Sequence, residues 1–118
     1  MNAEALRERT KDFAVRVIRF VEKSPKGIAR TVLARQLIRC ATSVGANYRA
    51  ACRARSRAEF AAKMQIVQEE ADEAQYWLEL LETLDRDLTG ELSKLRLEST
   101  ELSAIFTASI STIRRNKE

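Results

Sequence analysis

Residues that form turns are scarce in this chain, which has three glycines and one proline among its 118 residues. A β-sandwich or barrel needs a turn about every ten residues, and dinucleotide-binding α/β folds need glycine-rich loops. The chain is instead rich in alanine, leucine, glutamate, arginine and lysine, which have the highest helix propensities. The sequence therefore predicts an all-α protein, and its length suits a single domain that spans residues 1–118.

Helical periodicity and its interruptions predict four helices. The stretch Ser24-Pro25-Lys26-Gly27 separates the first from the second. A capping box begins the third, where the Ser56 hydroxyl and the Glu59 carboxylate each accept a hydrogen bond from a free backbone amide. The predicted helices cover residues 2–22, 28–53, 57–86 and 90–116. Because short connections make consecutive helices antiparallel, we expect an up-down-up-down antiparallel four-helix bundle.

Charge is strongly segregated along the chain, although the formal net charge is only +4. Residues 23–58 hold nine basic side chains and no acidic one, whereas residues 59–91 hold ten acidic and two basic side chains. Two interpretations are open. The basic and acidic helices neutralise each other, within or between subunits, or the arginine-rich surface binds an external polyanion.

The chain has no histidine, which removes the commonest general base and the commonest zinc ligand. Di-iron carboxylate bundles need Glu-x-x-His pairs, so the acidic cluster of Glu69, Glu70, Asp72 and Glu73 does not fit such a centre. No nucleophile–base pair or phosphate-binding loop is recognisable. We therefore predict a protein that is not an enzyme and has no metal or other cofactor.

Two cysteines, Cys40 and Cys52, lie twelve residues apart in one predicted helix. Twelve residues of helix span ~18 Å, which is far beyond the reach of a disulfide. They are therefore expected to be small buried apolar side chains in a reducing compartment. No stretch of sequence resembles a signal peptide or a membrane span. We expect a cytoplasmic protein with no membrane association.

The end of the second predicted helix and the start of the third carry the main candidate for nucleic-acid binding. The residues of this basic elbow are Arg49, Arg53, Arg55, Arg57 and Lys63. Arginine forks match phosphate oxygens, so these residues suit contacts to a nucleic-acid backbone. The alternative is structural, because arginines at the end of a helix also oppose its dipole and pair with carboxylates. Only Tyr48 is near enough to stack on a base, which disfavours recognition of base sequence.

A second group of polar residues is predicted to be structural. Arg39, Ser43 and Asn47 follow one another at intervals of four residues and so share a helical face. We expect them to make buried hydrogen bonds that fix helix register, with Glu73 of the neighbouring helix as a partner. Trp77 has helical spacing with apolar residues and is expected in the core or at an interface. The first predicted helix has a second apolar face, which favours self-association.

The central part of the chain, residues 37–81, carries a pattern that combines Ser43, Asn47, a basic stretch, Glu59-Phe60 and Tyr76-Trp77-Leu78. The residues that make up this pattern are 39–51, 53–60, 63–64, 69–74 and 76–81. The pattern resembles that of the 23S ribosomal-RNA intervening-sequence protein family. The resemblance implies a bacterial four-helix bundle that assembles into a ring-like homopentamer. Genes of this family can lie inside sequences inserted in large-subunit rRNA, and a related bundle assists a retroelement reverse transcriptase.

Two hypotheses for the function follow. In the first, the protein is a nucleic-acid-associated oligomer whose arginine-rich elbow contacts the phosphate backbone of RNA or DNA. In the second, it is a protein–protein interaction scaffold whose basic and acidic helices pair within or between subunits, and its ligand is a protein partner such as a reverse transcriptase.

Overall fold

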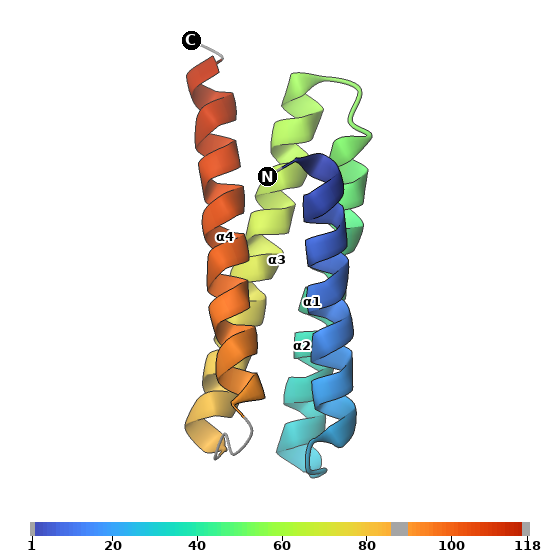
Figure 1. Cartoon of the computed structure of the whole chain (residues 1–118), viewed down its shortest axis with the longest axis vertical. Coiled ribbons are helices and arrows are strands. Elements are labelled where there is room, and N and C mark those ends of the chain that lie inside the picture. The colour runs from blue at the N-terminus through green and yellow to red at the C-terminus, as the bar shows by residue number, and fades with distance from the viewer. Residues whose placement is uncertain (1, 86–89, 117–118) are drawn as a thin grey trace.

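The computed structural model describes residues 2–85 and 90–116, and these form four helices. The helices are α1 (Ala3–Lys23), α2 (Ile28–Cys52), α3 (Arg57–Leu84) and α4 (Glu91–Asn116). Consecutive helices run antiparallel, and α4 packs back on α1 to close the bundle (Figure 1). The molecule is an elongated rod of 49 × 22 × 19 Å. The prediction of an all-α four-helix bundle is confirmed.

The ends of the helices lie close to their predicted positions. The Asn2 side chain accepts a hydrogen bond from the Ala5 amide at 2.7 Å and caps α1. Ser56 caps α3 by accepting from the Glu59 amide at 3.1 Å, while the Glu59 carboxylate accepts from the Arg55 amide at 3.2 Å. The reciprocal half of the capping box is thus made one residue earlier than expected. The predicted end of the third helix, residue 86, lies outside the described residues.

Apolar side chains from all four helices meet along the axis of the bundle. The largest side chains that are fully buried include Phe13, Leu37, Met64, Leu78, Leu102 and Phe106. Trp77 is half-buried and packs against this core, as expected. In the described part of the chain, no buried side-chain nitrogen or oxygen atom lacks a hydrogen bond. None of the described helices is long and apolar enough to cross a membrane.

Gly45 of α2 faces α1 at a close approach of the two helices. A Cβ atom added at Gly45 would lie 3.4 Å from Thr10 Oγ1 and 3.6 Å from Thr10 Cβ, which are ordinary contact distances. We therefore expect Gly45→Ala to raise the free energy of unfolding by up to about 1 kcal/mol, because glycine inside a helix is unfavourable. Gly45→Leu is expected to lower it by about 1–3 kcal/mol through overpacking. Urea denaturation of the two variants measures both effects, and a destabilised alanine variant would contradict the prediction.

Ion pairs join α1 to α4, the two neighbouring helices that pack least extensively. Arg9 Nε donates to Glu98 Oε2 at 2.8 Å, and Arg9 Nη2 donates to Glu98 Oε1 at 2.6 Å and to Glu101 Oε2 at 2.8 Å. Arg16 Nε lies 3.5 Å from Glu91 Oε1 further along the same interface. The hydrogen bond from Arg9 holds the pKa of Glu98 below its ordinary value of 4.5, and the positive charge of Arg9 acts in the same direction.

Acid is expected to weaken the α1–α4 interface through Glu98. Because the pKa of Glu98 is lower in the folded state, the stabilisation is complete above pH 4.5 and is lost as the pH falls through the folded-state pKa. Between neutral pH and pH ~3, the wild type should lose about 1 kcal/mol more stability than Glu98→Gln. Urea denaturation across this pH range measures the difference. The control is Glu8→Gln, which removes the same charge from an exposed position on α1. Its free energy of unfolding should show the same dependence on pH as that of the wild type.

Candidate functional site

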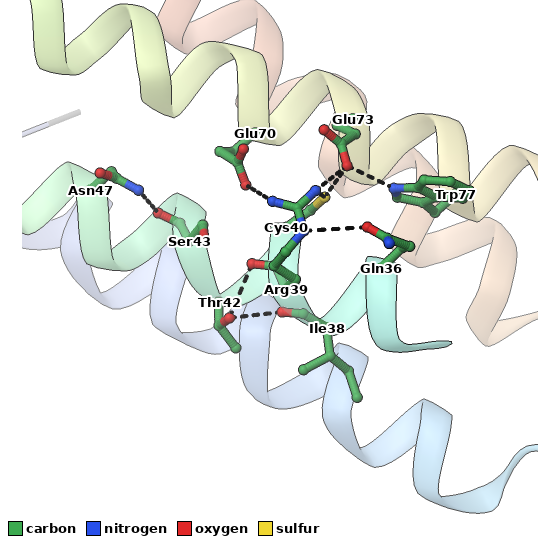
Figure 2. A network of polar contacts seen from close by, with 10 residues as sticks. All are labelled: Gln36, Ile38, Arg39, Cys40, Thr42, Ser43, Asn47, Glu70, Glu73 and Trp77. Carbon is green, nitrogen blue, oxygen red and sulfur yellow. Dashed lines mark hydrogen bonds and ion pairs between the residues drawn. The ribbon is translucent and has the colours of Figure 1, made fainter. Parts of the chain in front are cut away.

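A cluster of polar side chains bridges the middle of α2 and α3 (Figure 2). One oxygen of Glu73, Oε2, accepts hydrogen bonds from Cys40 Sγ at 3.0 Å, from Trp77 Nε1 at 3.1 Å and from Arg39 Nη2. Arg39 Nη1 also donates to Glu70 Oε2 at 3.2 Å. The cluster therefore joins the two central helices through the carboxylates of Glu73 and Glu70.

The titration of this cluster points to a structural role. Hydrogen bonds from Cys40 and Trp77, together with the nearby Arg39 guanidinium, lower the pKa of Glu73 and keep it ionised. Burial and the adjacent Glu73 carboxylate raise the pKa of the Cys40 thiol to about 12. Since the thiolate is the nucleophilic form of cysteine, Cys40 is unreactive at neutral pH. The cluster ties Arg39 and Cys40 of α2 to carboxylates of α3, which is consistent with the predicted role in helix register.

Ser43 and Asn47 do not belong to this cluster, which corrects the expectation of one buried polar row. Asn47 Nδ2 donates to the backbone carbonyl of Ser43 at 2.9 Å, inside α2, and both residues are only half-buried. The Arg39 side chain is 49% exposed. A helix has 3.6 residues per turn, so a row of every fourth residue drifts about 40° at each step and leaves the α2–α3 contact. Of the three residues of the predicted row, only Arg39 forms a hydrogen bond with Glu73.

The residues of the basic elbow gather at one end of the bundle, where α2 ends and α3 begins (upper end in Figure 1). Arg49, Arg53 and Arg55 are exposed and Lys63 is half-buried. None of these four forms an ion pair with any residue in the ranges 2–85 and 90–116. Arg57 differs, because its Nη1 donates to the backbone carbonyl of Asn116 at 3.1 Å and so fixes the end of α4.

Two arginines nearer the start of α2 are paired, whereas the exposed Arg35 forms no ion pair with a described residue. Arg30 forms an ion pair with Asp85 just beyond the end of α3, and Arg39 pairs with Glu70 and Glu73. Neutralisation between the basic and acidic helices thus holds for these two arginines. Among the described residues it does not extend to the end of α2, where Arg49 and Arg53 form no ion pair.

The structure adds basic residues from the two outer helices to this end. Arg7 lies in the second turn of α1, and Arg114 and Arg115 lie in the last turn of α4. Arg7, Arg49 and Arg53 line a cavity of 320 Å³ together with Cys52. Arg7 could have been predicted from the antiparallel pairing of α1 with α2, because this pairing brings the start of α1 beside the end of α2. In the structure, Thr10 of α1 faces Gly45 of α2.

The two cysteines differ in burial. Cys40 is buried as expected, whereas Cys52 is half-buried and lines the 320 Å³ cavity. Its position in the last turn of α2, at the end of the bundle, explains the difference. Burial is the main cause that raises the pKa of Tyr48 to about 12. The neighbouring Cys52 thiol also raises this pKa, and the positive charge of Arg7 lowers it.

A larger cavity of 590 Å³ lies near the other end of the bundle. It lies between the α1–α2 connection and the end of α3, and apolar side chains such as Phe20, Ile38 and Leu81 form much of its lining. Three basic residues, Lys26, Arg30 and Arg35, line it together with the acidic Glu22 and Asp85, and Arg30 is paired with Asp85. Because two carboxylates share this lining, the cavity suits an anion less well than the smaller one.

Comparison with known proteins gives the family of the chain. The sequence model of the 23S rRNA-intervening sequence protein family matches residues 5–108. Among solved structures, a protein of unknown function from the S23 ribosomal protein family of Bacteroides thetaiotaomicron is 31% identical with a TM-score of 0.79, over 94% of this chain and 99% of that chain. No curated protein matches. The chain therefore belongs to the 23S rRNA-intervening sequence protein family.

Proposed function

We propose that this protein is a non-enzymatic, cytoplasmic oligomer that binds the phosphate backbone of RNA or DNA through the arginine-rich end of its bundle. The observation that carries the proposal is the contrast within the basic segment. Arg30 and Arg39 are paired with carboxylates, whereas Arg49, Arg53 and Arg55 have no acidic partner among the described residues. Exposed guanidinium groups without a carboxylate suit the fork geometry of phosphate recognition.

The surroundings of these arginines favour contacts to the backbone over contacts to bases. Tyr48 is only 6% exposed and packs against Phe106 with the ring centroids 6.0 Å apart, and Phe60 at the start of α3 is half-buried against the core. The exposed Tyr76 lies near the other end of α3, ~28 Å along the helix from its start. Since recognition of single-stranded bases relies on exposed aromatic platforms, the binding should tolerate many sequences.

Two names support a nucleic-acid ligand. The family is named for intervening sequences of 23S rRNA, and the similar protein from Bacteroides thetaiotaomicron is assigned to a ribosomal protein family. Both are consistent with a chain that works in contact with RNA.

Self-association is part of the proposal, with the homopentamer of related proteins as the expected assembly. Ile28 is 93% exposed and Val32 is 55% exposed on α2, and Ile66 and Tyr76 are exposed on the neighbouring α3. Apolar side chains that protrude from adjacent helices favour burial against another subunit. An oligomer would also present several arginine-rich ends to one nucleic acid and so raise the overall affinity.

A salt series tests the nucleic-acid proposal. Nuclease-treated protein is titrated against labelled structured RNA and labelled duplex DNA at increasing salt concentrations. If each chain uses the four elbow cations that have no ion pair among the described residues, the logarithm of the duplex affinity should fall with the logarithm of the salt concentration with a slope of about −3 to −4 per bound chain. Failure to bind either ligand at low salt, with the assembly intact, would overturn the proposal.

A protein–protein scaffold is the second candidate. The ion pairs of Arg30 and Arg39 with α3 and its cap, together with the exposed Ile28 and Val32, favour it. If the remaining basic and acidic surfaces pair between subunits, high salt should dissociate the assembly, because exposed ion pairs are screened. Sedimentation of the free protein across the same salt series separates this behaviour from the release of nucleic acid.

A further inference from the structure

Three arginines from two helices surround one hollow at the basic end of the bundle. Arg7 of α1, Arg49 of α2 and Arg53, which caps α2, line the cavity of 320 Å³ with Cys52 as its fourth member. No acidic side chain among residues 2–85 and 90–116 lines it. Within the part of the chain that the structure describes, none of the three arginines forms an ion pair.

Such an arrangement is unfavourable unless an anion joins it. Three like charges around one hollow repel each other, and nearby carboxylates relieve this repulsion at Arg9, Arg30 and Arg39 elsewhere in the molecule. Arg7 is half-buried, so its guanidinium is less well hydrated than that of an arginine fully in solvent. An anion with several acceptor oxygens would accept hydrogen bonds from all three guanidinium groups at once.

We propose that the hollow formed by Arg7, Arg49, Arg53 and Cys52 binds a phosphate group. A phosphate carries more charge and more acceptor oxygens than a carboxylate, so it matches three guanidinium groups better. The volume lies at the lower end of the roughly 300–1,000 Å³ typical of small-molecule sites, which suits a phosphate with its attached sugar. When the bound phosphate belongs to a nucleic-acid backbone, this inference rests on the proposed function. A free phosphate or a nucleotide is the other source of the same chemistry.

The Cys52 thiol provides a probe of occupancy in the native protein. Cys52 is half-buried and lines the hollow, whereas Cys40 is fully buried and should not react in the folded state. A bound phosphate covers the sulfur atom and offsets the positive charge beside it, and both effects slow attack by the thiolate. We therefore expect inorganic phosphate to slow the alkylation of Cys52 in a saturable way, by roughly tenfold, relative to chloride at the same ionic strength.

Two variants test whether the arginines are responsible. Arg7→Gln removes the member of the hollow that lies outside the elbow, and protection by phosphate should disappear. Arg19→Gln removes an exposed arginine of the same helix that does not line the hollow, and protection should remain. Equal protection in the wild type and in Arg7→Gln would overturn the three-arginine site, as would its absence from the wild type.

A third arm separates the sources of the phosphate and the two proposals. Structured RNA and a 5′-phosphorylated dinucleotide replace inorganic phosphate in the same assay. Protection by RNA supports a backbone phosphate in the hollow. If inorganic phosphate protects Cys52 but the protein binds neither RNA nor DNA, the result supports the hollow as a site for a free anion and overturns the proposed function. Salt-sensitive binding of RNA without protection of Cys52 overturns the hollow and leaves the proposed function in place.

Discussion

Replacing Phe106 by alanine is expected to lower the free energy of unfolding by about 3–5 kcal/mol. Phe106 of α4 is fully buried, and its ring lies against Tyr48 of α2 across the bundle, with the ring centroids 6.0 Å apart. Truncation removes the packing of a large ring and leaves a cavity that four long helices can only partly close. Because a domain of this size has a total stability of about 5–15 kcal/mol, the variant should be marginally folded.

Chemical denaturation at a fixed protomer concentration measures this loss, since the stability of an oligomer depends on concentration. Leu97→Ala is the matched control, because Leu97 is on the same helix and is 55% exposed. Its effect should stay within about 0.5 kcal/mol. A loss below about 1 kcal/mol for Phe106→Ala would mean that this residue is not part of the packed core.

Reversing the charge of Arg49, Arg53 and Arg55 together is expected to lower the affinity for RNA and duplex DNA by about a hundredfold or more at moderate salt. Each arginine that contacts a phosphate contributes about one unit to the salt slope, so the slope should become about three units shallower. Glutamate at these positions also repels the phosphates. Binding across a salt series, compared with the wild type, measures both quantities.

The variant should still fold, because none of the three arginines has an acidic partner among the described residues and all three are exposed. Arg49 and Arg53 oppose the dipole at the end of α2, so a loss of about 1 kcal/mol in stability is expected from that source. Helical circular dichroism at the assay temperature checks the fold.

A second triple variant controls for net charge. Arg19, Lys23 and Lys26 are exposed residues at the other end of the bundle, around the end of α1. Changing them to glutamate alters the net charge by the same amount and should leave most of the affinity intact. An equal loss in the two triple variants would show that affinity follows the overall charge of the molecule, and would exclude a site at the arginine-rich end.

The sequence predicted correctly the features that depend on neighbours along the chain. The stretch 24–27, the Ser56 cap and Gly90 interrupt helical periodicity locally, so the helix limits followed from nearby residues. The family could also be predicted from the sequence, because its motifs lie in the two central helices. Even here a local detail differed, since the Glu59 carboxylate accepts from the Arg55 amide and not from that of Ser56.

The candidate site was predicted only in part, because it depends on which side chains meet across helices. The sequence gives the elbow its five basic residues, but it does not show that Arg57 is held by the end of α4 or that Arg39 is held by Glu70 and Glu73. Both residues are arginines like those that have no acidic partner among the described residues, so residue type alone does not separate the two groups. Their partners are selected by the rotation and offset of neighbouring helices, which are set by packing over the whole bundle.

By itself, then, the sequence determined that this protein is a bundle of four antiparallel helices with its charge divided between the second and the third. Local propensity and periodicity are sufficient for that, since each helix is specified by residues within a few turns of one another. Only the tertiary structure decided which arginines remain free, and only it brought Arg7 beside Arg49 and Arg53, some forty residues away. The reason is that an ion pair or a shared hollow needs atoms within a few ångströms, and that proximity arises only when the helices pack together.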